Sequence, residues 1–318
     1  MTGPPAATAA VRLAVRRVLP PGTVAAAVSG GADSLALAAA LAFERPGSFS
    51  LVVDHGLQEG SDVVAARAAE QCRGLGLEAQ VLGPSRSSGT RTDPDADNAA
   101  KTMDGGPEAQ ARALRYRLLA GAADQLGLSA VLLGHTLDDQ AETVLLGLAR
   151  GSGARALAGM AASRDVFRRP LLGLSREVTA KACAEAALVP WEDPHNGDPR
   201  FARVRVRIRV LPVLEQELGP GIAEALARTA QQLREDADAL DALTPDTADC
   251  VELAALPAAL RSRAVKRWAE QACGRALTAA HVDALRALVE EWHGQGPVDL
   301  PGGVRVTRTG GSLSVVPA

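Results

Sequence analysis

A chain of 318 residues is long enough for two domains, each with its own hydrophobic core. With 47% hydrophobic and 22% charged residues the composition is that of an ordinary globular protein, and no run approaches the roughly 20 apolar residues of a membrane span. The formal net charge of −3 excludes an overall basic signature for a nucleic-acid partner, so local basic patches must be considered.

The start of the chain and its cysteines bear on where the protein works. Arginines lie inside the apolar part of the first 21 residues rather than before it, and this order is not that of a signal peptide. We expect a first helix over residues 6–19. The four cysteines are far apart and contain no C-x-x-C pair, which argues against a zinc site, an iron–sulfur cluster or a disulfide framework. These features predict a reducing, cytoplasmic setting without membrane contact.

Residues 24–42 combine a small apolar run, a glycine turn and a helix-forming stretch. Gly30 and Gly31 have no Cβ, so the backbone can approach phosphate oxygens, and the following helix points its free N–H groups at the same spot. Asp33 is placed to hold a Mg²⁺ ion on the phosphates. No lysine lies near, which excludes a Walker P-loop. A glycine-rich surface turn is the alternative, but the segment resembles the pyrophosphate-binding loop of the ATP pyrophosphatases, formed by Ser29, Gly30, Gly31, Ala32, Asp33 and Ser34.

From residue 24 to about 189, short apolar runs alternate with helical patterns, which predicts βαβ units. The expected strands are 24–28, 50–53, 78–82 and 130–133. The expected helices between them are 35–42, 62–74 and 107–126. The fold class is therefore α/β, with a Rossmann-like, doubly wound parallel sheet that binds ligands at the carboxyl ends of its strands. Residues 83–106 are rich in Pro, Ser, Gly and Asp, and we expect a long mobile loop there.

The residues that end the second and fourth strands are assigned to the nucleotide. At Val53 and Asp54, backbone groups would meet a base lying over the sheet, although Asp54-His55-Gly56 is equally typical of a polar strand end. Gly134 and His135 follow the fourth strand and complete the expected nucleotide site.

The helix expected over 107–126 carries Glu108, Arg112 and Arg115 at i, i+4 and i+7, so they share one face. Taken alone, this spacing favours a surface salt-bridge ladder. Beside an ATP loop, the arginine pair becomes a reasonable clamp for polyphosphate.

Thr136 can cap a helix whose first turn contains Asp138 and Asp139, with Glu142 one turn further on. Acids in a first turn often do no more than cap the helix and satisfy its dipole. Three carboxylates on roughly one face at a strand's carboxyl end exceed that need, and they could bind Mg²⁺, a substrate ammonium group or both. Asp33 and Asp138 are the expected magnesium ligands.

Past residue 212 the pattern changes. Apolar residues recur at three- and four-residue spacing from Ile222 to Leu240 and predict one long amphipathic helix, with further helices over 257–272 and 278–292. Residues 298–315 alternate and turn at two Gly-Gly pairs, which is typical of a small β-meander. We therefore expect an ATP-pyrophosphatase domain over 1–214, a linker helix over 215–245, and a smaller, mainly helical C-terminal domain over 246–318 that ends in the meander.

These motifs, with Arg169-Pro-Leu-Leu and Trp191-Glu-Asp-Pro-His-Asn196, make residues 24 to about 214 resemble the tRNA(Ile)-lysidine synthetases, and the C-terminal part more loosely. The resemblance implies that ATP, with Mg²⁺, adenylates the C2 oxygen of the wobble cytidine in tRNA(Ile) with a CAU anticodon. The ε-amine of free lysine then attacks C2 and expels AMP, which changes the codon read from AUG to AUA. It also implies a C-terminal domain that binds tRNA.

The resemblance assigns the chemistry to Asp33, Arg112, Arg115, Asp138, Asp139 and Glu142. In that assignment the arginines help the leaving pyrophosphate, and one of the three neighbouring acids holds lysine and assists proton removal. The sequence leaves open which acid contacts lysine.

One motif departs from the family. Relatives commonly show Arg-Asn-x-Ile-Arg where this chain has Arg203-Val-Arg205-Val-Arg207, so an asparagine contact is missing. The alternation permits a strand, whereas the family suggests the start of a helix. Positive charge gathers here, and phosphate contact with tRNA is favoured over a solvated face. The expected tRNA-binding residues are Arg200, Arg203, Arg205 and Arg207.

Two other functions are compatible with the same loop. A tRNA thiolase generally needs cysteines near the ATP site, and only the isolated Cys72 and Cys183 lie in this part of the chain. A non-catalytic ATP-binding or tRNA-binding protein would leave the three carboxylates idle. How the C-terminal domain tells tRNA(Ile) from tRNA(Met), and whether the chain forms a homodimer, stay open at this level.

Overall fold

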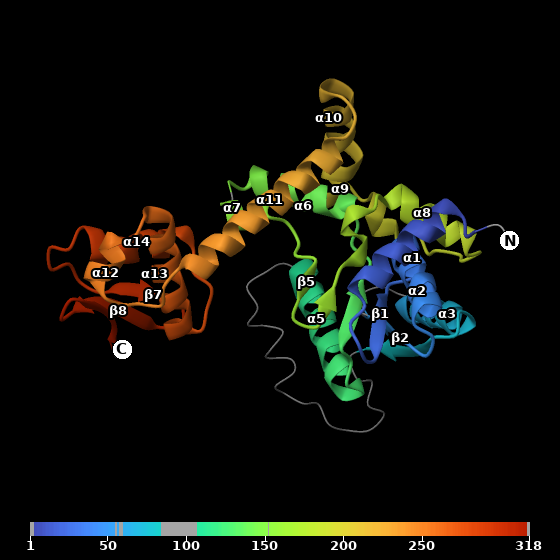
Figure 1. Ribbon diagram of the computed structural model, residues 1–318, viewed down its shortest axis with the longest axis horizontal. Helices are drawn as coiled ribbons and strands as arrows, with labels where there is room; N and C mark the ends of the chain where they lie inside the picture. Colours follow the sequence, from blue (N-terminus) through green and yellow to red (C-terminus); the bar gives the residue numbers. More distant parts are fainter. Residues whose placement is uncertain (1–2, 55, 57–59, 84–106, 152, 317–318) are drawn as a thin grey trace. The chain divides into compact units, whose positions relative to one another are not determined.

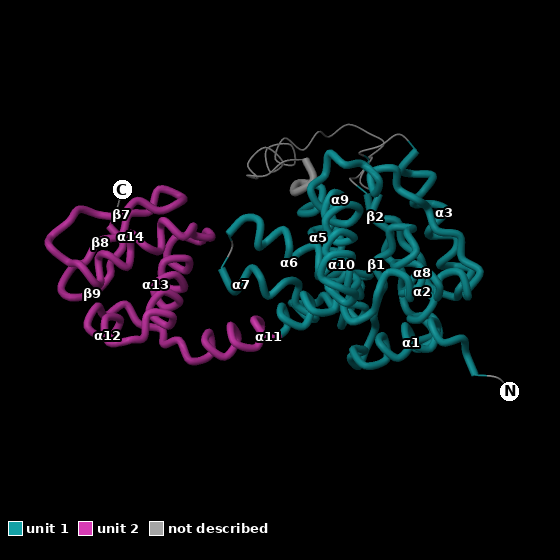
Figure 2. The backbone as a smooth tube through the Cα atoms, turned by 90° about the horizontal axis from the view of Figure 1, so that it is seen from above, with its two compact units in different colours: residues 1–231 teal, residues 232–318 magenta. Residues whose placement is uncertain are grey.

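The computed structural model describes residues 3–54, 56, 60–83, 107–151 and 153–316. The loop expected over 83–106, except its first residue, and His55 therefore lie outside the described residues. The chain divides into two compact units, Met1–Gln231 and Gln232–Ala318 (Figure 2). Among the described helices, none combines the length and the apolar character that a membrane span requires.

The first unit is built on a six-stranded sheet with the order β3-β2-β1-β4-β6-β5. The four predicted strands are confirmed, the second starting one residue earlier than expected: β1 Val24–Val28, β2 Phe49–Val53, β3 Glu78–Leu82 and β4 Ala130–Leu133. They pair in parallel. Two unexpected strands, β5 Ser163–Arg164 and β6 Phe167–Arg168, form an antiparallel hairpin at the far edge, and each is too short to give a sequence pattern.

Both faces of the sheet are covered, which is why the central strands β1 and β4 are apolar throughout. Val24, Ala26 and Val28 of β1 pack in one core with α1 (Ala6–Val18), α2 (Ala32–Glu44), α3 (Ser61–Gly74) and α8 (Arg176–Glu185). Ala25 packs in the opposite core with α5 (Pro107–Leu126). Figure 1 shows α1 and α2 to one side of β1 and α5 to the other. The two-residue period of the strand thus produces the layered α/β fold that the sequence predicts.

Apart from the hairpin of β5 and β6, the regular structure between β4 and the second unit is helical. It contains α6 (Leu137–Ala149), α7 (Ala154–Leu157), α9 (Ala202–Arg205), a π-helical turn η3 (Val206–Val210), α10 (Leu211–Leu218) and α11 (Ile222–Leu243). Short 3₁₀ turns, η1 (Pro170–Gly173) and η2 (Pro194–Gly197), join these segments. The arginine-rich motif is therefore helical, and the strand alternative is wrong, because Arg205 and Val206 have helical backbone angles (φ −59° at both, with ψ −40° and −47°). Val204 and Val206 are both buried, and α9 and η3 contact α6.

The region expected as a single linker helix over 215–245 contains the end of α10 and all of α11. Gly219 and Gly221 separate the two helices at φ values of +95° and +94°, a conformation that side chains with a Cβ rarely adopt. The boundary between the two compact units lies within α11.

The second unit packs α12 (Cys250–Ala255), α13 (Ala258–Cys273) and α14 (Ala279–Glu290) around a core that includes Leu253, Val265 and Leu285. An antiparallel sheet, β7 (Val298–Leu300), β8 (Val304–Thr309) and β9 (Ser312–Val316), completes it. The predicted meander is confirmed, and the glycine pairs 302–303 and 310–311 make its two turns at positive φ. The sequence missed only the six-residue α12 among these elements.

Candidate active site

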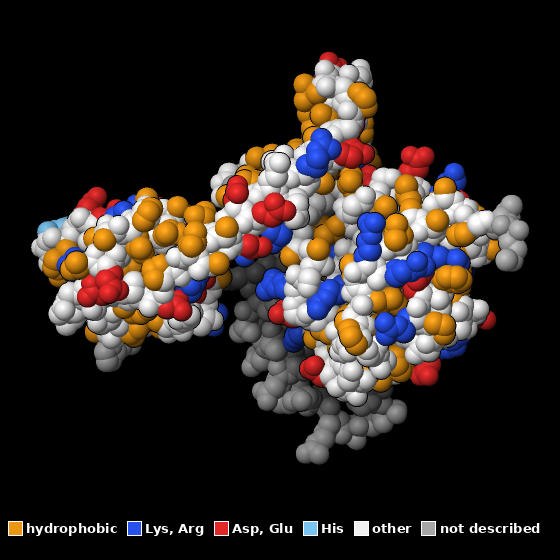
Figure 3. Space-filling model, viewed as in Figure 1, with side chains coloured by type: hydrophobic (Ala, Val, Ile, Leu, Met, Phe, Trp, Pro, Cys, Tyr) orange, Lys and Arg blue, Asp and Glu red, His pale blue; other side chains and the backbone are white. Residues whose placement is uncertain are grey.

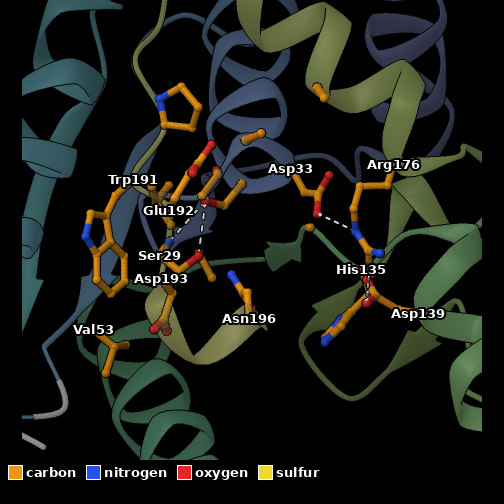
Figure 4. Close-up of a pocket in the computed structure, with 18 of the residues that line it drawn as sticks. Ser29, Asp33, Val53, His135, Asp139, Arg176, Trp191, Glu192, Asp193 and Asn196 are labelled. Atoms are coloured by element: carbon orange, nitrogen blue, oxygen red, sulfur yellow. Dashed lines mark hydrogen bonds and ion pairs between the residues drawn. The ribbon is translucent and has the colours of Figure 1, made fainter. Parts of the chain in front are cut away.

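A cavity of about 870 Å³ opens at the carboxyl ends of the central strands (Figure 4). Its wall brings together the turn after β1, the ends of β2 and β4, the starts of α2, α6 and α8, and residues 190–197. These segments are far apart in the sequence. Their meeting at this edge of the sheet is what a doubly wound fold predicts for a ligand site.

The turn between β1 and α2 presents backbone donors to the cavity. Gly30 has φ +87°, and Gly31 precedes a helix that has no side-chain cap. The Ser34 hydroxyl bridges the turn, donating to the Gly31 carbonyl at 2.8 Å and accepting from the Ser29 N–H at 3.2 Å. The N–H groups at the start of α2 have no side-chain cap and are therefore available to an anion, which is the arrangement that a phosphate loop requires.

Gly134, directly after β4, lies too close to the start of α2 for a larger residue to fit without a shift. A Cβ there would lie 3.2 Å from the Ser34 backbone nitrogen and 3.3 Å from the Asp33 carbonyl oxygen. The end of β4 thus presses directly on the start of α2. This close approach fixes the position of the turn relative to the rest of the sheet.

The predicted base-binding residues differ in their surroundings. Val53 lines the cavity, together with Ala27, Leu51 and Leu119, and gives it an apolar side. Asp54 is absent from the cavity lining among the described residues, and its carboxylate accepts hydrogen bonds from the Gly56 N–H at 3.0 Å and the Ser61 hydroxyl at 2.7 Å. Asp54 therefore ties the end of β2 to Gly56 and to the first residue of α3.

Only one of the two predicted clamp arginines reaches the cavity. Arg115 lines it and forms no ion pair with any residue that the structure describes, and burial lowers the pKa of its guanidinium. Arg112 is exposed and contacts Tyr116, with its guanidinium 5.3 Å from the ring centroid. The side chain of Glu108, expected on the same face, lies outside the described part. Arg115 is thus a cation at the cavity wall that an anionic ligand can pair with.

His135 also lines the cavity. Burial and the positive charge of Arg115 lower its pKa to about 3, so the imidazole is neutral near pH 7. Its Nδ1 is buried and has no hydrogen-bond partner within the described residues. A bound ligand can supply that partner.

The three acids of α6 have three different environments. The Glu142 side chain is fully buried, and the Arg207 guanidinium grips it with Nε–Oε1 and Nη2–Oε2 distances of 2.7 and 3.2 Å. Asp138 accepts the Arg176 backbone N–H at 2.7 Å and so caps α8. Among the three, Asp139 alone lines the cavity.

Asp139 lies between two guanidinium groups, with its Oδ1 2.9 Å from Arg176 Nη2 and 3.8 Å from Arg207 Nη2. Burial opposes ionisation, but Arg176 and the Thr136 N–H hold the pKa of Asp139 below its usual value. It is therefore a stable anion at the cavity wall.

Asp33 lines the cavity at the first turn of α2. Its carboxylate accepts a hydrogen bond from the Thr179 hydroxyl, and its Oδ2 lies 3.8 Å from Arg176 Nε. Burial raises the pKa of Asp33, against the effects of Thr179 and Arg176.

The four predicted tRNA-binding arginines do not share one face. Arg203 and Arg207 turn inward to Glu142, whereas Arg205 is exposed and donates to the Pro199 and Arg200 carbonyls. Arg200 is exposed and pairs with Asp198, with an Nη2–Oδ2 distance of 2.6 Å.

The sequence analysis missed two parts of the cavity wall. Arg176 carries no recognisable spacing signal, because its partners in α6 lie 34 to 38 residues earlier in the chain and Asp33 lies 143 residues earlier. Residues 190–197 served only as a mark of family resemblance, yet Trp191, Asp193 and Asn196 line the cavity. The Trp191 N–H donates to the Gly30 carbonyl at 2.9 Å, which ties this wall to the phosphate turn.

The fold and site define a nucleotide-binding enzyme of the PP-loop class. Residues 8–214 match the family model of the PP-loop domain, and residues 249–313 match that of the TilS substrate binding domain. The tRNA(Ile)-lysidine synthase of Thermobifida fusca is 50% identical over 335 residues, which cover 99% of each chain. That of Leifsonia xyli subsp. xyli is 51% identical, covering 91% of this chain and 88% of its own.

The chain belongs to the tRNA(Ile)-lysidine synthase family of tRNA-modifying ligases, which confirms the resemblance drawn from the sequence motifs. Among solved structures, the U34-tRNA thiolase NcsA from Methanococcus maripaludis, solved with its 4Fe-4S cluster, gives a TM-score of 0.56 at 21% identity. It covers 72% of this chain and 80% of its own. This likeness shows the fold alone.

Proposed function

We propose that the chain ligates free lysine to C2 of the wobble cytidine of tRNA(Ile) with a CAU anticodon, using ATP and releasing pyrophosphate and AMP. One observation carries the proposal. A single cavity joins the phosphate turn to the Asp139, Arg176 and Arg207 side chains. A two-step ligation needs both reactants at one place, because the activated cytidine formed in the first step must meet lysine in the second.

In the first step the cytidine O2 bonds to the α-phosphorus of ATP, and the bond from that phosphorus to the β-phosphate bridge breaks. The uncapped start of α2 and Arg115 suit the phosphates, and the apolar side that contains Val53 suits the adenine. The unpartnered Nδ1 of His135 is one further contact that the nucleotide can make.

Asp33 is the residue that would hold Mg²⁺, because its carboxylate lines the cavity beside the anion site and its ion pair with Arg176 is long at 3.8 Å. The metal would offset the charge that develops on the departing pyrophosphate. Asp138 suits this task less well, since it caps α8 and is not among the described residues that line the cavity.

In the second step the lysine Nε bonds to C2, the C2–O bond to AMP breaks, and the amine loses a proton. Free lysine has a zwitterionic head group, and the cavity offers Asp139 between Arg176 and Arg207 as a matching set of charges. We assign the α-ammonium to Asp139 and the α-carboxylate to the arginines. The lowered pKa of Asp139 suits a counter-ion rather than a base, and this leaves the ε-amine free to lose its charge and attack.

For the tRNA, we assign phosphate contact to the exposed Arg200 and Arg205, and the anchoring of Glu142 to Arg203 and Arg207. In the view of Figure 3, basic side chains are spread over the first unit rather than gathered in one patch. We therefore assign a share of the tRNA contacts to the second unit, which contains the matched substrate binding domain. A cytoplasmic setting fits these three substrates.

The thiolase alternative finds less support. None of the four cysteines, all of which the structure describes, lines the cavity. Burial raises the pKa of Cys183 to about 11 and also raises that of Cys72, which makes both poor nucleophiles.

The test is incubation with ATP, Mg²⁺, labelled lysine and a tRNA(Ile) transcript with a CAU anticodon. We expect label in the tRNA with release of AMP and pyrophosphate, and no incorporation into a transcript with U at the wobble position. Release of AMP without label in the tRNA would reject the proposed ligation.

A further inference from the structure

The first turn of α8 joins the two halves of the site. The Leu137 N–H donates to the Leu174 carbonyl at 2.9 Å, and the Arg176 N–H donates to Asp138 at 2.7 Å, so α6 and α8 start side by side. One turn into α8, the Thr179 hydroxyl holds Asp33. The start of α8 therefore contacts the nucleotide side and the lysine side at once.

The Arg176 side chain reaches from Asp33 on the nucleotide side to Asp139 on the lysine side (Figure 4). Its Nε lies 3.8 Å from Asp33 Oδ2, and its Nη2 lies 2.9 Å from Asp139 Oδ1 and 3.4 Å from Glu142 Oε1. Among the described residues, Arg176 alone forms ion pairs with acids of both halves. Arg207, by comparison, reaches only Asp139 and Glu142.

The arginines are one fewer than the acids. Four carboxylates, Asp33, Asp138, Asp139 and Glu142, face three guanidinium groups, Arg176, Arg203 and Arg207. Arg203 and Arg207 are held by Glu142, and the N-terminus of α8 satisfies Asp138. Asp33 and Asp139 thus share Arg176, which is the one ion-pair partner of Asp33 among the described residues, whereas Asp139 also has Arg207 at 3.8 Å.

We propose that Arg176 couples nucleotide binding to lysine binding, so that each ligand weakens the binding of the other. When Asp33 turns to the cation that accompanies the nucleotide, Arg176 loses that partner and is repelled towards Asp139, where it competes with the α-ammonium of lysine for the carboxylate, while Arg207 remains for the α-carboxylate. After pyrophosphate and its cation leave, Asp33 takes Arg176 back and Asp139 becomes available. Arg176 is thus a positioning residue that delays tight lysine binding until cytidine is activated.

The inference rests on the proposed function in one respect, the assignment of Asp33 to the nucleotide and Asp139 to lysine. Linkage makes the coupling reciprocal, so it can be measured by lysine binding alone. A purely structural ion pair would affect the stability of the fold but would leave lysine affinity insensitive to the nucleotide.

The experiment is equilibrium dialysis of labelled lysine against the full chain, with and without Mg²⁺ and α,β-methylene ATP, which cannot release pyrophosphate. For the natural chain we expect the lysine Kd to rise at least about fivefold with the nucleotide, the lower end of typical coupling. In Arg176→Gln the ratio of the two Kd values should fall to about one. Arg207→Gln is the matched control, since it removes the same charge from Asp139 and Glu142 without touching Asp33, and its ratio should persist.

Arg176→Lys guards against a variant that fails to fold, because it keeps the charge but has one ammonium in place of the guanidinium fork. Its ratio should lie between those of the natural chain and Arg176→Gln. An unchanged ratio in either Arg176 variant, or no effect of the nucleotide on the natural chain, would overturn the coupling while lysidine formation still supports the proposed function. Absence of both lysine binding and lysidine formation would remove the proposed function itself, and the coupling with it.

Discussion

The two halves of the cavity are built by different means. The nucleotide half is mainly backbone: a glycine turn, the uncapped start of α2 and the close approach of Gly134. The lysine half is made of side-chain ion pairs contributed by α6, α8 and the π-helical turn η3. Backbone donors are fixed once the local fold forms, whereas an ion-pair network holds only if every member is present. The two halves should therefore fail in different ways when altered.

The largest effect is expected from Glu142→Gln, on the lysine half. The change leaves Arg207, Arg203 and Arg176 around a neutral side chain that is fully buried, and loss of one member of a buried pair typically costs about 3–5 kcal/mol. Urea unfolding of the full chain measures this loss. Asp165→Asn is the control, because its pair with Arg164 is exposed and should be worth less than about 1 kcal/mol. Equal losses in the two variants would show that the network has no special role.

On the nucleotide half, Asp33→Asn should leave the fold nearly intact and remove function. The amide keeps the shape of the carboxylate and can still accept the Thr179 hydrogen bond, but it loses the charge that would hold Mg²⁺. We expect release of pyrophosphate from ATP in the presence of tRNA to fall by about 100-fold or more. A normal rate would exclude Asp33 from the first step.

The nucleotide half of the cavity could be predicted from the sequence, and the lysine half could not. The strand, turn and helix at residues 24–44 are contiguous, so pattern and turn chemistry suffice to place the phosphate site. Strands β1 and β4 were predicted to the residue because burial on both faces makes each one a continuous apolar run. Strand β3, which is only partly buried, was also predicted to the residue.

The lysine half could not be predicted in this way. Arg207 grips Glu142 across 65 positions, and Arg176 reaches Asp33 across 143 positions, so no local spacing joins them. The sequence therefore assigned Arg203 and Arg207 to tRNA phosphates, and nothing indicated that they turn towards α6. Burial of a charged network is a tertiary property that appears only when the fold is known.

A smaller effect is expected from Gly134→Ala, which tests whether the backbone half depends on close packing. The new Cβ would lie 3.2 Å from the Ser34 nitrogen, so β4 or the start of α2 must shift by a few tenths of an ångström. We expect a loss of about tenfold in ATP affinity, corresponding to about 1.4 kcal/mol, measured by calorimetry. Gly121→Ala in α5 is the control, since its Cβ would meet nothing within 4 Å and alanine favours a helix. Unchanged ATP affinity in Gly134→Ala would show that the turn tolerates the shift.

The smallest effect concerns pH and His135, which lies where the two halves meet. Burial and Arg115 depress the pKa of folded His135 to about 3, whereas an unfolded histidine titrates near 6.5. Below about pH 6.5 the unfolded chain therefore takes up a proton that the folded chain refuses, and this contribution to stability is lost as the pH falls towards 3. His135→Gln has no such proton to take up.

Thermal melts at pH 7 and pH 5 measure the difference. Between pH 7 and pH 5 the melting temperature of the natural chain should fall by a few degrees more than that of His135→Gln. Raised salt should weaken the effect of Arg115 on His135 only slightly, because the two side chains are shielded from solvent. A variant with the same pH dependence as the natural chain would mean that His135 titrates normally in the fold. In that case its imidazole would be charged below pH 6.5 and would act on the nucleotide phosphates as a second cation beside Arg115, which joins the two halves through charge rather than through packing.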